Sequence, residues 1–214
     1  MKNNAFPKKD REVLEKAVAL ATELHKEQKR ASGKPYITHP IAVMEILKKL
    51  NFPPIALAIA VLHDVCEDTK ITNIDMYSLF PERVVFVVYA LSKNQKPKDN
   101  QKWRKFYQEA KQRKEEGISS FEAYIDYRFT IYMRRFYLGC LADPYVMYVK
   151  MADQIHNLSD MKFLPESKRK RKIWEVENHF LPLYRKMQNA IMPDSFDQYS
   201  ALLSLLENTL QKSS

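Results

Sequence analysis

Residues 53–69 read PPIALAIAVLHDVCEDT, and this stretch decides the fold. Its two prolines suit the first turn of a helix, and the eight residues that follow are apolar on every side. A helix without a polar face has to be buried, so we expect it at the centre of the protein. The apolar run ends in four groups that bind metals or carry protons: His63, Asp64, Glu67 and Asp68. These residues end the helix, so the first and third of them share one face, and the second and fourth share the adjacent face.

Apolar residues recur at helical spacing along most of the remaining chain. The spacing predicts helices over residues 13–24, 39–50, 73–79, 81–91, 124–141, 143–158, 170–190 and 196–210. Only three glycines occur, which excludes the Gly-rich phosphate loops GxGxxG and GxxxxGKS/T and argues against a β-sandwich or barrel. We therefore predict an all-α fold, a compact bundle of helices. Residues 1–192 form the main domain, and residues 193–214 add a last helix, packed on it, and a short tail.

The chain is strongly basic. Its 35 lysines and arginines exceed its 26 aspartates and glutamates, which gives a net charge of +9. Such a surface favours anionic partners, whether nucleotides, nucleic acid or acidic lipid headgroups. Two cysteines are too few for a disulfide scaffold or a Cys-based zinc site. The N-terminus lacks the apolar core of a signal peptide, and no apolar run approaches the roughly 20 residues of a membrane span, so we expect a cytoplasmic protein without a membrane partner.

Two further residues complete a candidate metal site. His39 stands at the start of the helix before the apolar stretch, and Asp153 lies on a later helix, away from its apolar stripe. With His63 and Asp64 they offer two imidazoles and two carboxylates, a donor set that suits Mn²⁺, Fe²⁺ or Zn²⁺. A His-Asp pair alone is common and does not indicate a metal site. A single histidine or aspartate is more often a helix cap or a surface group than a metal ligand. Several polar groups on the end of so apolar a helix, however, cost stability unless they have a partner, which favours the metal site.

Glu67 and Asp68 remain free in this arrangement. One of them can take a proton from an attacking water while the other orients the water or protonates a leaving group. Asn157 follows Asp153 by four residues, so it shares the same helix face and can donate to a substrate oxygen. Other polar groups nearby are expected to be structural: His25, Tyr36 and His156.

These residues fall in three motifs, which read RASGKPYITHP at residues 30–40, LHDVCEDT at 62–69 and VKMADQIHNL at 149–158. The motifs resemble the hydrolase domain of the RelA/SpoT homologue superfamily, a branch of the HD metal-dependent phosphohydrolases. Both their order and their spacing are similar, and the resemblance covers residues 10–185. No synthetase domain follows, so the chain resembles a stand-alone small alarmone hydrolase.

The resemblance implies a specific reaction. Members of this superfamily remove the 3′-pyrophosphate of guanosine tetra- or pentaphosphate (ppGpp or pppGpp), giving GDP or GTP and pyrophosphate, normally with Mn²⁺. By motif position, the metal would be held in a central cleft by His39, His63, Asp64 and Asp153. The attacking water would be activated by Glu67 and Asp68. Along the substrate would lie Arg30, Ser32 and Asn157.

Two departures from the superfamily's pattern leave other substrates open. Ala31 and Gln154 stand where basic residues are usual, so an adenosine alarmone of the ppApp type is an alternative substrate. Another HD nucleotide phosphohydrolase, such as an NADPH phosphatase, is a second alternative. Candidates for gripping the 5′-phosphates are Lys34, Lys168, Arg169, Lys170 and Arg171.

The basic segment over residues 93–116 leaves a non-catalytic alternative open. It carries Trp103, Phe106 and Tyr107, and basic residues with aromatics are what a protein needs to bind single-stranded nucleic acid. The same charges also suit a polyphosphate, so we favour a small nucleotide over nucleic acid as the partner. The sequence leaves the oligomeric state open.

Overall fold

The computed structural model describes residues 6–93, 120–188, 191 and 193–213. In chain order its helices are α1 (Lys8–Leu24), α2 (Thr38–Lys49), α3 (Pro54–Leu62), α4 (Val65–Asp68), α5 (Asn73–Leu79), α6 (Glu82–Leu91), α8 (Ser120–Ala142), α9 (Tyr145–Ser159), α10 (Glu166–Glu175), α11 (Leu181–Met187) and α12 (Phe196–Ser213). Between them lie two 3₁₀ turns, η1 (Met161–Phe163) and η4 (Pro193–Ser195), and a π-helical turn, η2 (Val176–Phe180). Within the described ranges there is no β-strand, so the all-α prediction is confirmed. Most of the basic segment over 93–116 lies outside the described residues.

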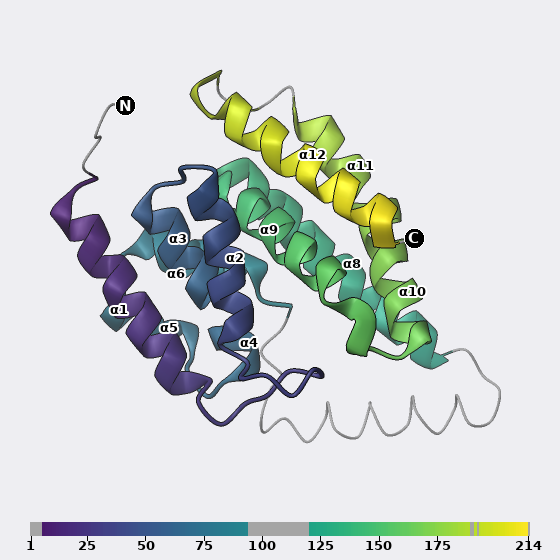
Figure 1. Ribbon diagram of the computed structural model, residues 1–214, viewed down its shortest axis with the longest axis horizontal. Helices are drawn as coiled ribbons and strands as arrows, with labels where there is room; N and C mark the ends of the chain where they lie inside the picture. The colour runs from purple at the N-terminus through teal and green to yellow at the C-terminus, as the bar shows by residue number, and fades with distance from the viewer. Residues whose placement is uncertain (1–5, 94–119, 189–190, 192, 214) are drawn as a thin grey trace.

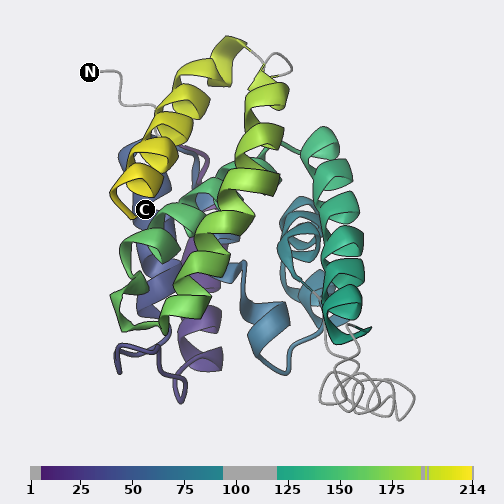
Figure 2. The ribbon, with the colours of Figure 1, turned by 90° about the vertical axis from the view of Figure 1, so that its right-hand side faces the viewer.

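Helix α3 lies at the centre of the molecule, as its sequence predicts. Residues 56–62 are each at most 5% exposed. Residues of α1, α2, α6 and α9 contact it, and these helices are grouped around it in Figures 1 and 2. Each Å² of apolar surface removed from water contributes about 25 cal/mol, so a helix that is apolar on all sides is most stable here. This packing fixes the position of the polar residues that follow Leu62.

Helix α9 forms the second part of the core. It contacts α2, α3, α6 and α8, and α12 runs along its outer side (Figure 1). Its start is fixed by Asp143, whose carboxylate accepts the N–H of Tyr145 at 2.9 Å and pairs with Arg83. Because α2, α3 and α9 contact one another, the three sequence motifs meet in one place. No helix in the described part of the chain combines the length and the apolar character that a bilayer crossing requires.

The local signals for helix starts and types are confirmed at α5 and α6. Thr72 and Asp75 cap α5 reciprocally, each side chain accepting from the other's backbone N–H. The valine-rich run over 84–88 resembles a strand but forms the middle of α6, whose apolar side is buried. The helix predicted over 170–190 begins earlier, at Glu166, and its middle widens into the π-helical turn η2.

The structure departs from prediction at His63 and Asp64. Helix α3 ends at Leu62 and α4 begins only at Val65, so the polar residues do not extend one continuous helix. His63 Nδ1 lies 2.7 Å from the carbonyl oxygen of Ala60, the same carbonyl that an uninterrupted helix offers to the N–H of residue 64. The side chain takes this acceptor and the chain turns. The expectation that residues 63 and 67 share a face of one helix is therefore wrong.

Candidate metal centre

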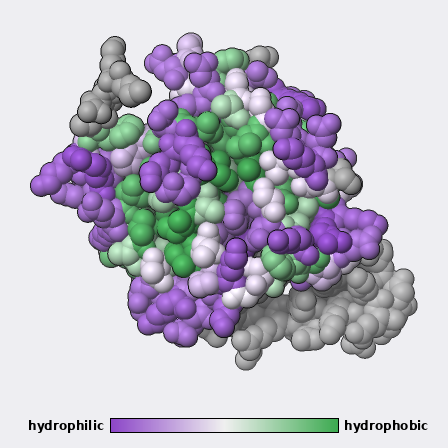
Figure 3. Space-filling view, in the orientation of Figure 1, coloured by the Kyte–Doolittle hydropathy of each residue, from purple (hydrophilic) through white to green (hydrophobic). Residues whose placement is uncertain are grey.

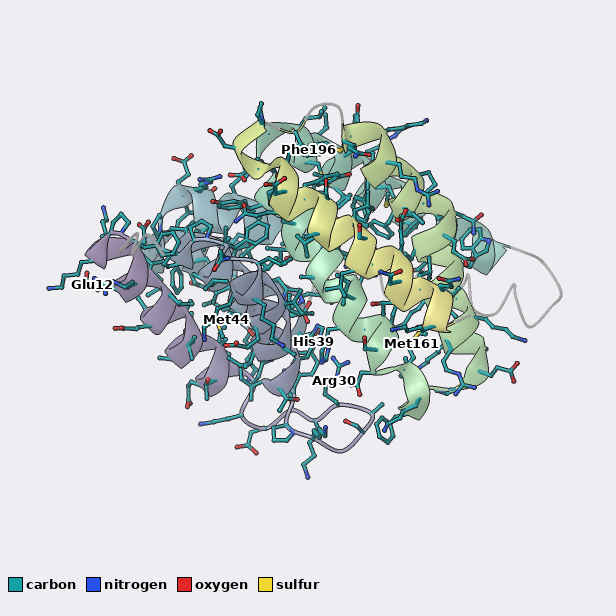
Figure 4. All side chains as sticks on the ribbon, turned by 45° about the horizontal axis from the view of Figure 1, so that its top comes forward. Glu12, Arg30, His39, Met44, Met161 and Phe196 are labelled. Atoms are coloured by element: carbon teal, nitrogen blue, oxygen red, sulfur yellow. The ribbon has the colours of Figure 1, made fainter. Side chains whose placement is uncertain are left out.

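Three buried side chains from separate elements converge between α2, α3 and α9. His39 lies in the first turn of α2 (Figure 4), His63 follows α3 and Asp153 lies on α9. Asp153 Oδ1 is 3.1 Å from His39 Nε2 and 3.6 Å from His63 Nε2. One ligand atom from each of the three residues lies within 4.8 Å of the others. Such a cluster of imidazole nitrogens and a carboxylate can surround one metal ion.

Asp64 joins the same cluster. Its Oδ2 is 3.2 Å from His63 Nε2 and 3.5 Å from His39 Nε2. The turn after α3 is what allows this, because it brings two adjacent residues to the same point. All four side chains that the sequence singles out as ligands are therefore together in the structure.

The orientation of His63 fits a cation. Its Nδ1 faces the Ala60 carbonyl, which can only accept, so Nδ1 carries a proton, and when the ring is neutral its lone pair is on Nε2. This Nε2 is buried and makes no hydrogen bond to a described residue, although carboxylate oxygens of Asp64 and Asp153 lie within 3.6 Å. Burial lowers the pKa of His63, but the two carboxylates outweigh it and raise this pKa well above its usual value. The site therefore calls for positive charge, supplied by a proton or by a metal held between nitrogen and oxygen atoms.

His156 lies directly behind His39. The two Nδ1 atoms are 2.8 Å apart, so a single proton joins them. Burial and the neighbouring His39 and Arg30 lower the pKa of His156 to about 4. His156 is therefore neutral near pH 7 and can accept from His39, which leaves Nε2 of His39 free to bind a metal. The prediction that His156 is not itself a ligand agrees with this position.

Lys150 was not anticipated by the sequence analysis. It is only 8% exposed, and its Nζ donates to Asp153 Oδ2 at 2.7 Å. Asp153 Oδ1, which faces the histidines, also accepts from Asn157 Nδ2 at 2.5 Å. Burial alone raises the pKa of Asp153, but Lys150 and the histidines outweigh it and hold this pKa well below its usual value. One signal in the sequence could have indicated this pair: the lysine lies on a helix face that is otherwise buried, three residues before the aspartate.

The two proposed proton carriers have different surroundings. Glu67 is half-buried, and its Oε2 accepts the backbone N–H of Lys93 at 2.7 Å. Asp68 is exposed as a whole residue, but its carboxyl is partly covered, and its Oδ2 accepts from the Tyr36 hydroxyl at 2.7 Å. Burial and the charge of Asp64 raise the pKa of both carboxyls. Both are thus better proton acceptors than ordinary surface carboxylates.

Tyr36 belongs to the site rather than merely packing behind it. Its hydroxyl lies 2.8 Å from Asp64 Oδ2 as well as 2.7 Å from Asp68 Oδ2. One hydroxyl hydrogen cannot serve both oxygens fully, so the two carboxylates compete for it. The purely structural role expected from the sequence is corrected here, since the hydroxyl links a proposed ligand to a proposed proton carrier.

A pocket of about 290 Å³, lined mostly by polar and charged residues, adjoins this cluster. Its walls include Tyr36 and Asn157, which connect it to the carboxylates of Asp64 and Asp153. Arg30, in the loop before α2 (Figure 4), lines it and pairs with Asp160 at 3.2 Å. The hydroxyl of Ser32 is buried there and has no hydrogen-bond partner among the described residues. The structure thus brings together three residues expected along the substrate: Arg30, Ser32 and Asn157.

The expected phosphate ligands are placed differently. Lys34 is exposed and does not line the pocket, and Lys170 lies in a separate groove, paired with Glu166 at 2.7 Å. Lys172, two residues further along α10, lines the pocket instead. Helical spacing explains the correction, because residues 170 and 172 differ by about 200° around a helix and face opposite sides.

The chain is similar to known proteins in family, in sequence and in fold. The sequence model of the HD domain family matches residues 17–189. The GTP pyrophosphokinase of Streptomyces coelicolor is 31% identical over 174 residues, covering 81% of this chain and 18% of that protein. The bifunctional (p)ppGpp synthase/hydrolase SpoT of Escherichia coli K12 is 33% identical over 174 residues (81% and 22%). The probable guanosine-3′,5′-bis(diphosphate) 3′-pyrophosphohydrolase of Synechocystis is 30% identical over 172 residues (80% and 20%). The chain spans about a fifth of the length of these relatives.

A solved structure has a similar fold. It belongs to a metazoan orthologue of SpoT, described as hydrolysing ppGpp and acting in starvation responses. The TM-score is 0.51 and the sequence identity 18%, with 98% of this chain and 90% of that chain covered. At this identity the likeness establishes a shared fold, and the placement of the four candidate ligands rests on the geometry described above.

Proposed function

This chain belongs to the HD domain family, and on that basis we propose that it is a metal-dependent 3′-pyrophosphohydrolase of ppGpp and pppGpp. The observation that carries the proposal is the buried set of two histidines and two aspartates beside a pocket with basic walls. Relatives named for this hydrolysis support the choice of substrate. Action on alarmones in the cytoplasm, as part of the stringent response, is included in the proposal.

We propose that the metal is Mn²⁺ or another divalent ion that prefers the same kinds of ligand atoms. It would be held by His39, His63, Asp64 and Asp153, a donor set of two nitrogens and two oxygens that suits such ions. When bound, the cation supplies Lewis-acid polarisation of a phosphoryl oxygen. Lys150 fixes Asp153 from behind through Oδ2, so that Oδ1 faces the two histidines.

Glu67 is the residue that we propose as the general base. The N–H of Lys93 holds its Oε2, while Oε1 makes no hydrogen bond to any residue that the structure describes. A carboxylate with a raised pKa accepts a proton more readily near neutral pH. Glu67 would take the proton of the water that attacks the 3′-phosphorus. The oxygen of that water leaves in the pyrophosphate.

Asp68 is the matching general acid. Burial and the nearby Asp64 raise its pKa, which keeps a larger fraction of the carboxyl protonated than on an ordinary surface residue. Its proton would go to the ribose 3′ oxygen as the phosphorus–oxygen bond breaks. Tyr36 holds the Asp68 carboxylate in position through its hydroxyl.

The basic walls of the adjoining pocket are suited to the rest of the substrate. Arg30, Lys29 and Lys172 line it, and each can pair with phosphate oxygens. Burial lowers the pKa of Lys172, and the positive Lys150 lowers it further despite Asp153, so an anion beside it is favoured. The hydroxyl of Ser32 makes no hydrogen bond to any part of the chain that the structure describes, so it can bond the nucleoside.

One observation keeps the adenosine alarmone as a second candidate substrate. Of the two departures from the family pattern, only Ala31 lines the pocket. Gln154 is buried on α9, and its side chain accepts from the hydroxyl of Tyr184 at 2.8 Å, so this departure serves the core. The small side chain of Ala31 is therefore the position at which base preference would change.

The substrate is tested by product analysis. The protein is incubated with Mn²⁺ and, separately, ppGpp, ppApp and NADPH, and the products are separated by anion exchange. The proposal expects GDP and pyrophosphate from ppGpp at the highest rate, with loss of turnover in Asp64→Asn and no change in the exposed control Asp194→Asn. Release of orthophosphate from NADPH as the main reaction would replace it with the phosphatase alternative.

A further inference from the structure

A second groove lies on the side of α10 that faces away from the metal centre. It runs between the turn after α9, one side of α10 and the end of α12, and it has a volume of about 670 Å³. Small-molecule sites in proteins occupy roughly 300–1,000 Å³. The pocket beside the metal centre, at about 290 Å³, is smaller. The groove is therefore large enough for a nucleotide.

The groove carries an excess of positive charge. Four cations line it, Lys162, Arg169, Lys170 and Lys212, against one carboxylate, Glu166. That carboxylate pairs with Lys170, so three cations have no ion pair with any described residue. Figure 3 shows a largely hydrophilic surface where α10 and the end of α12 lie in Figure 1. Four like charges around one groove repel one another, and an anion between them removes that repulsion.

Helix ends do not account for all of these cations. Lys212 lies in the last turn of α12, where a positive charge is favourable because it faces the negative end of the helix dipole. Arg169 lies at the end of the first turn of α10, toward the positive end of its dipole, where a cation is unfavourable. Lys170 follows it and pairs with Glu166. Arg169 is also half-buried. A bound anion explains the position of Arg169, whereas helix stabilisation does not.

The floor of the groove is apolar. Leu158 and Met161 are almost fully buried, and Ile173 closes the side formed by α10. A free phosphate gains nothing from such a floor, but a nucleobase does, because its faces are apolar. Basic rim and apolar floor together suit a nucleoside polyphosphate.

The groove and the pocket at the metal centre are opposite sides of one wall. Asn157, Asp160 and Lys172 face the pocket, while Leu158, Met161 and Ile173 face the groove. Figure 4 shows Met161 beside the end of α12, whose Thr209 and Lys212 also line the groove. We propose that the groove is a second binding site, separate from the metal centre, that takes a nucleoside triphosphate or a similar polyphosphorylated nucleotide.

Calorimetric titration tests the second site. The probe is GTP, and the full-length protein carries Arg30→Ala and Lys172→Ala, which remove cations from the pocket at the metal centre. We expect this variant to bind one GTP. Adding Arg169→Glu and Lys212→Glu should weaken that binding by at least about thirtyfold, because two attractive charge contacts become repulsive. A control with the same charge change at exposed positions, Lys49→Glu and Lys186→Glu, should bind as before.

Two results would overturn the proposal. One is that the Arg30→Ala, Lys172→Ala protein binds no GTP, although circular dichroism shows that it is folded, while the unmodified chain binds a single GTP. The other is equal affinity in the groove variant and the charge control. Inorganic tripolyphosphate is titrated in parallel, and it should bind about tenfold more weakly than GTP, because it cannot use the apolar floor. Equal binding of the two would overturn the assignment to a nucleotide.

Discussion

Replacing His156 by leucine removes the hydrogen-bond acceptor behind a proposed metal ligand. A metal can bind Nε2 of His39 only if that atom carries a lone pair, so the ring proton has to sit on Nδ1. That Nδ1 lies 2.8 Å from Nδ1 of His156, which accepts the proton because its lowered pKa keeps it neutral. Leucine offers no acceptor, so the required form of His39 loses its partner.

The magnitude follows from the burial of His39. Its exposed fraction is 1%, so water cannot replace the lost acceptor. An unsatisfied buried donor costs about 1–3 kcal/mol, and partners behind a metal ligand typically change metal affinity by roughly 10–100-fold. Both ranges centre on about 2 kcal/mol, or thirtyfold in the dissociation constant for Mn²⁺.

Electron paramagnetic resonance measures this directly, because free Mn²⁺ gives a sharp signal that disappears on binding. His156→Leu should bind Mn²⁺ about thirtyfold more weakly than the unmodified protein. His156→Asn is the matched variant, since its amide oxygen can accept from His39, and it should recover most of the affinity. Binding by His156→Leu within twofold of the unmodified protein, with the thermal midpoint unchanged, would refute the reasoning.

Three further predictions concern stability. Lys150→Met should lower the free energy of unfolding of the metal-free protein by about 3 kcal/mol in urea, because it removes the cation that pairs with the buried Oδ2 of Asp153. A loss no larger than that of the exposed control Lys186→Met would contradict this. Glu67→Gln should raise the thermal midpoint at pH 7 but not at pH 3. The pKa of Glu67 is higher in the folded protein than in the unfolded chain, so its charged form lowers stability as pH rises through these pKa values, and glutamine carries no charge. A midpoint difference between the variant and the unmodified protein that does not change with pH would contradict this. Mn²⁺ at 100 times its dissociation constant should stabilise the protein by about 2.7 kcal/mol. Calorimetry should show this as a rise of roughly 5–11 °C in the thermal midpoint, which EDTA reverses. No rise would count against the metal site.

The helices were predictable because apolar spacing reports which residues face the core. The run over 55–62 could only be a buried helix, and Thr72 with Asp75 marked the start of α5. The four candidate ligands were also proposed from the sequence. Their residue types and motif spacing restricted them to one cluster, and the contacts between α2, α3 and α9 bring them together.

Spacing does not report competition for a hydrogen bond or the partner of a charge. The ring of His63 takes the Ala60 carbonyl and ends α3, which no periodicity reveals. In the sequence, Lys150 and Asp153 look like two independent charged residues, and only the folded structure shows that they form a buried pair. Lys170 and Lys172 are equivalent in composition, and only the rotation of α10 against the pocket separates them.

The most direct test of the account is the release of pyrophosphate from ppGpp by the Mn²⁺-loaded protein. We predict stoichiometric GDP and pyrophosphate, resolved by ³¹P nuclear magnetic resonance, with turnover lost on adding EDTA and in Asp153→Asn. Turnover should also fall in Glu67→Gln, which keeps the proposed ligands but removes the proposed base. A folded, Mn²⁺-loaded protein that leaves ppGpp intact, or that converts it to orthophosphate instead, would contradict the account.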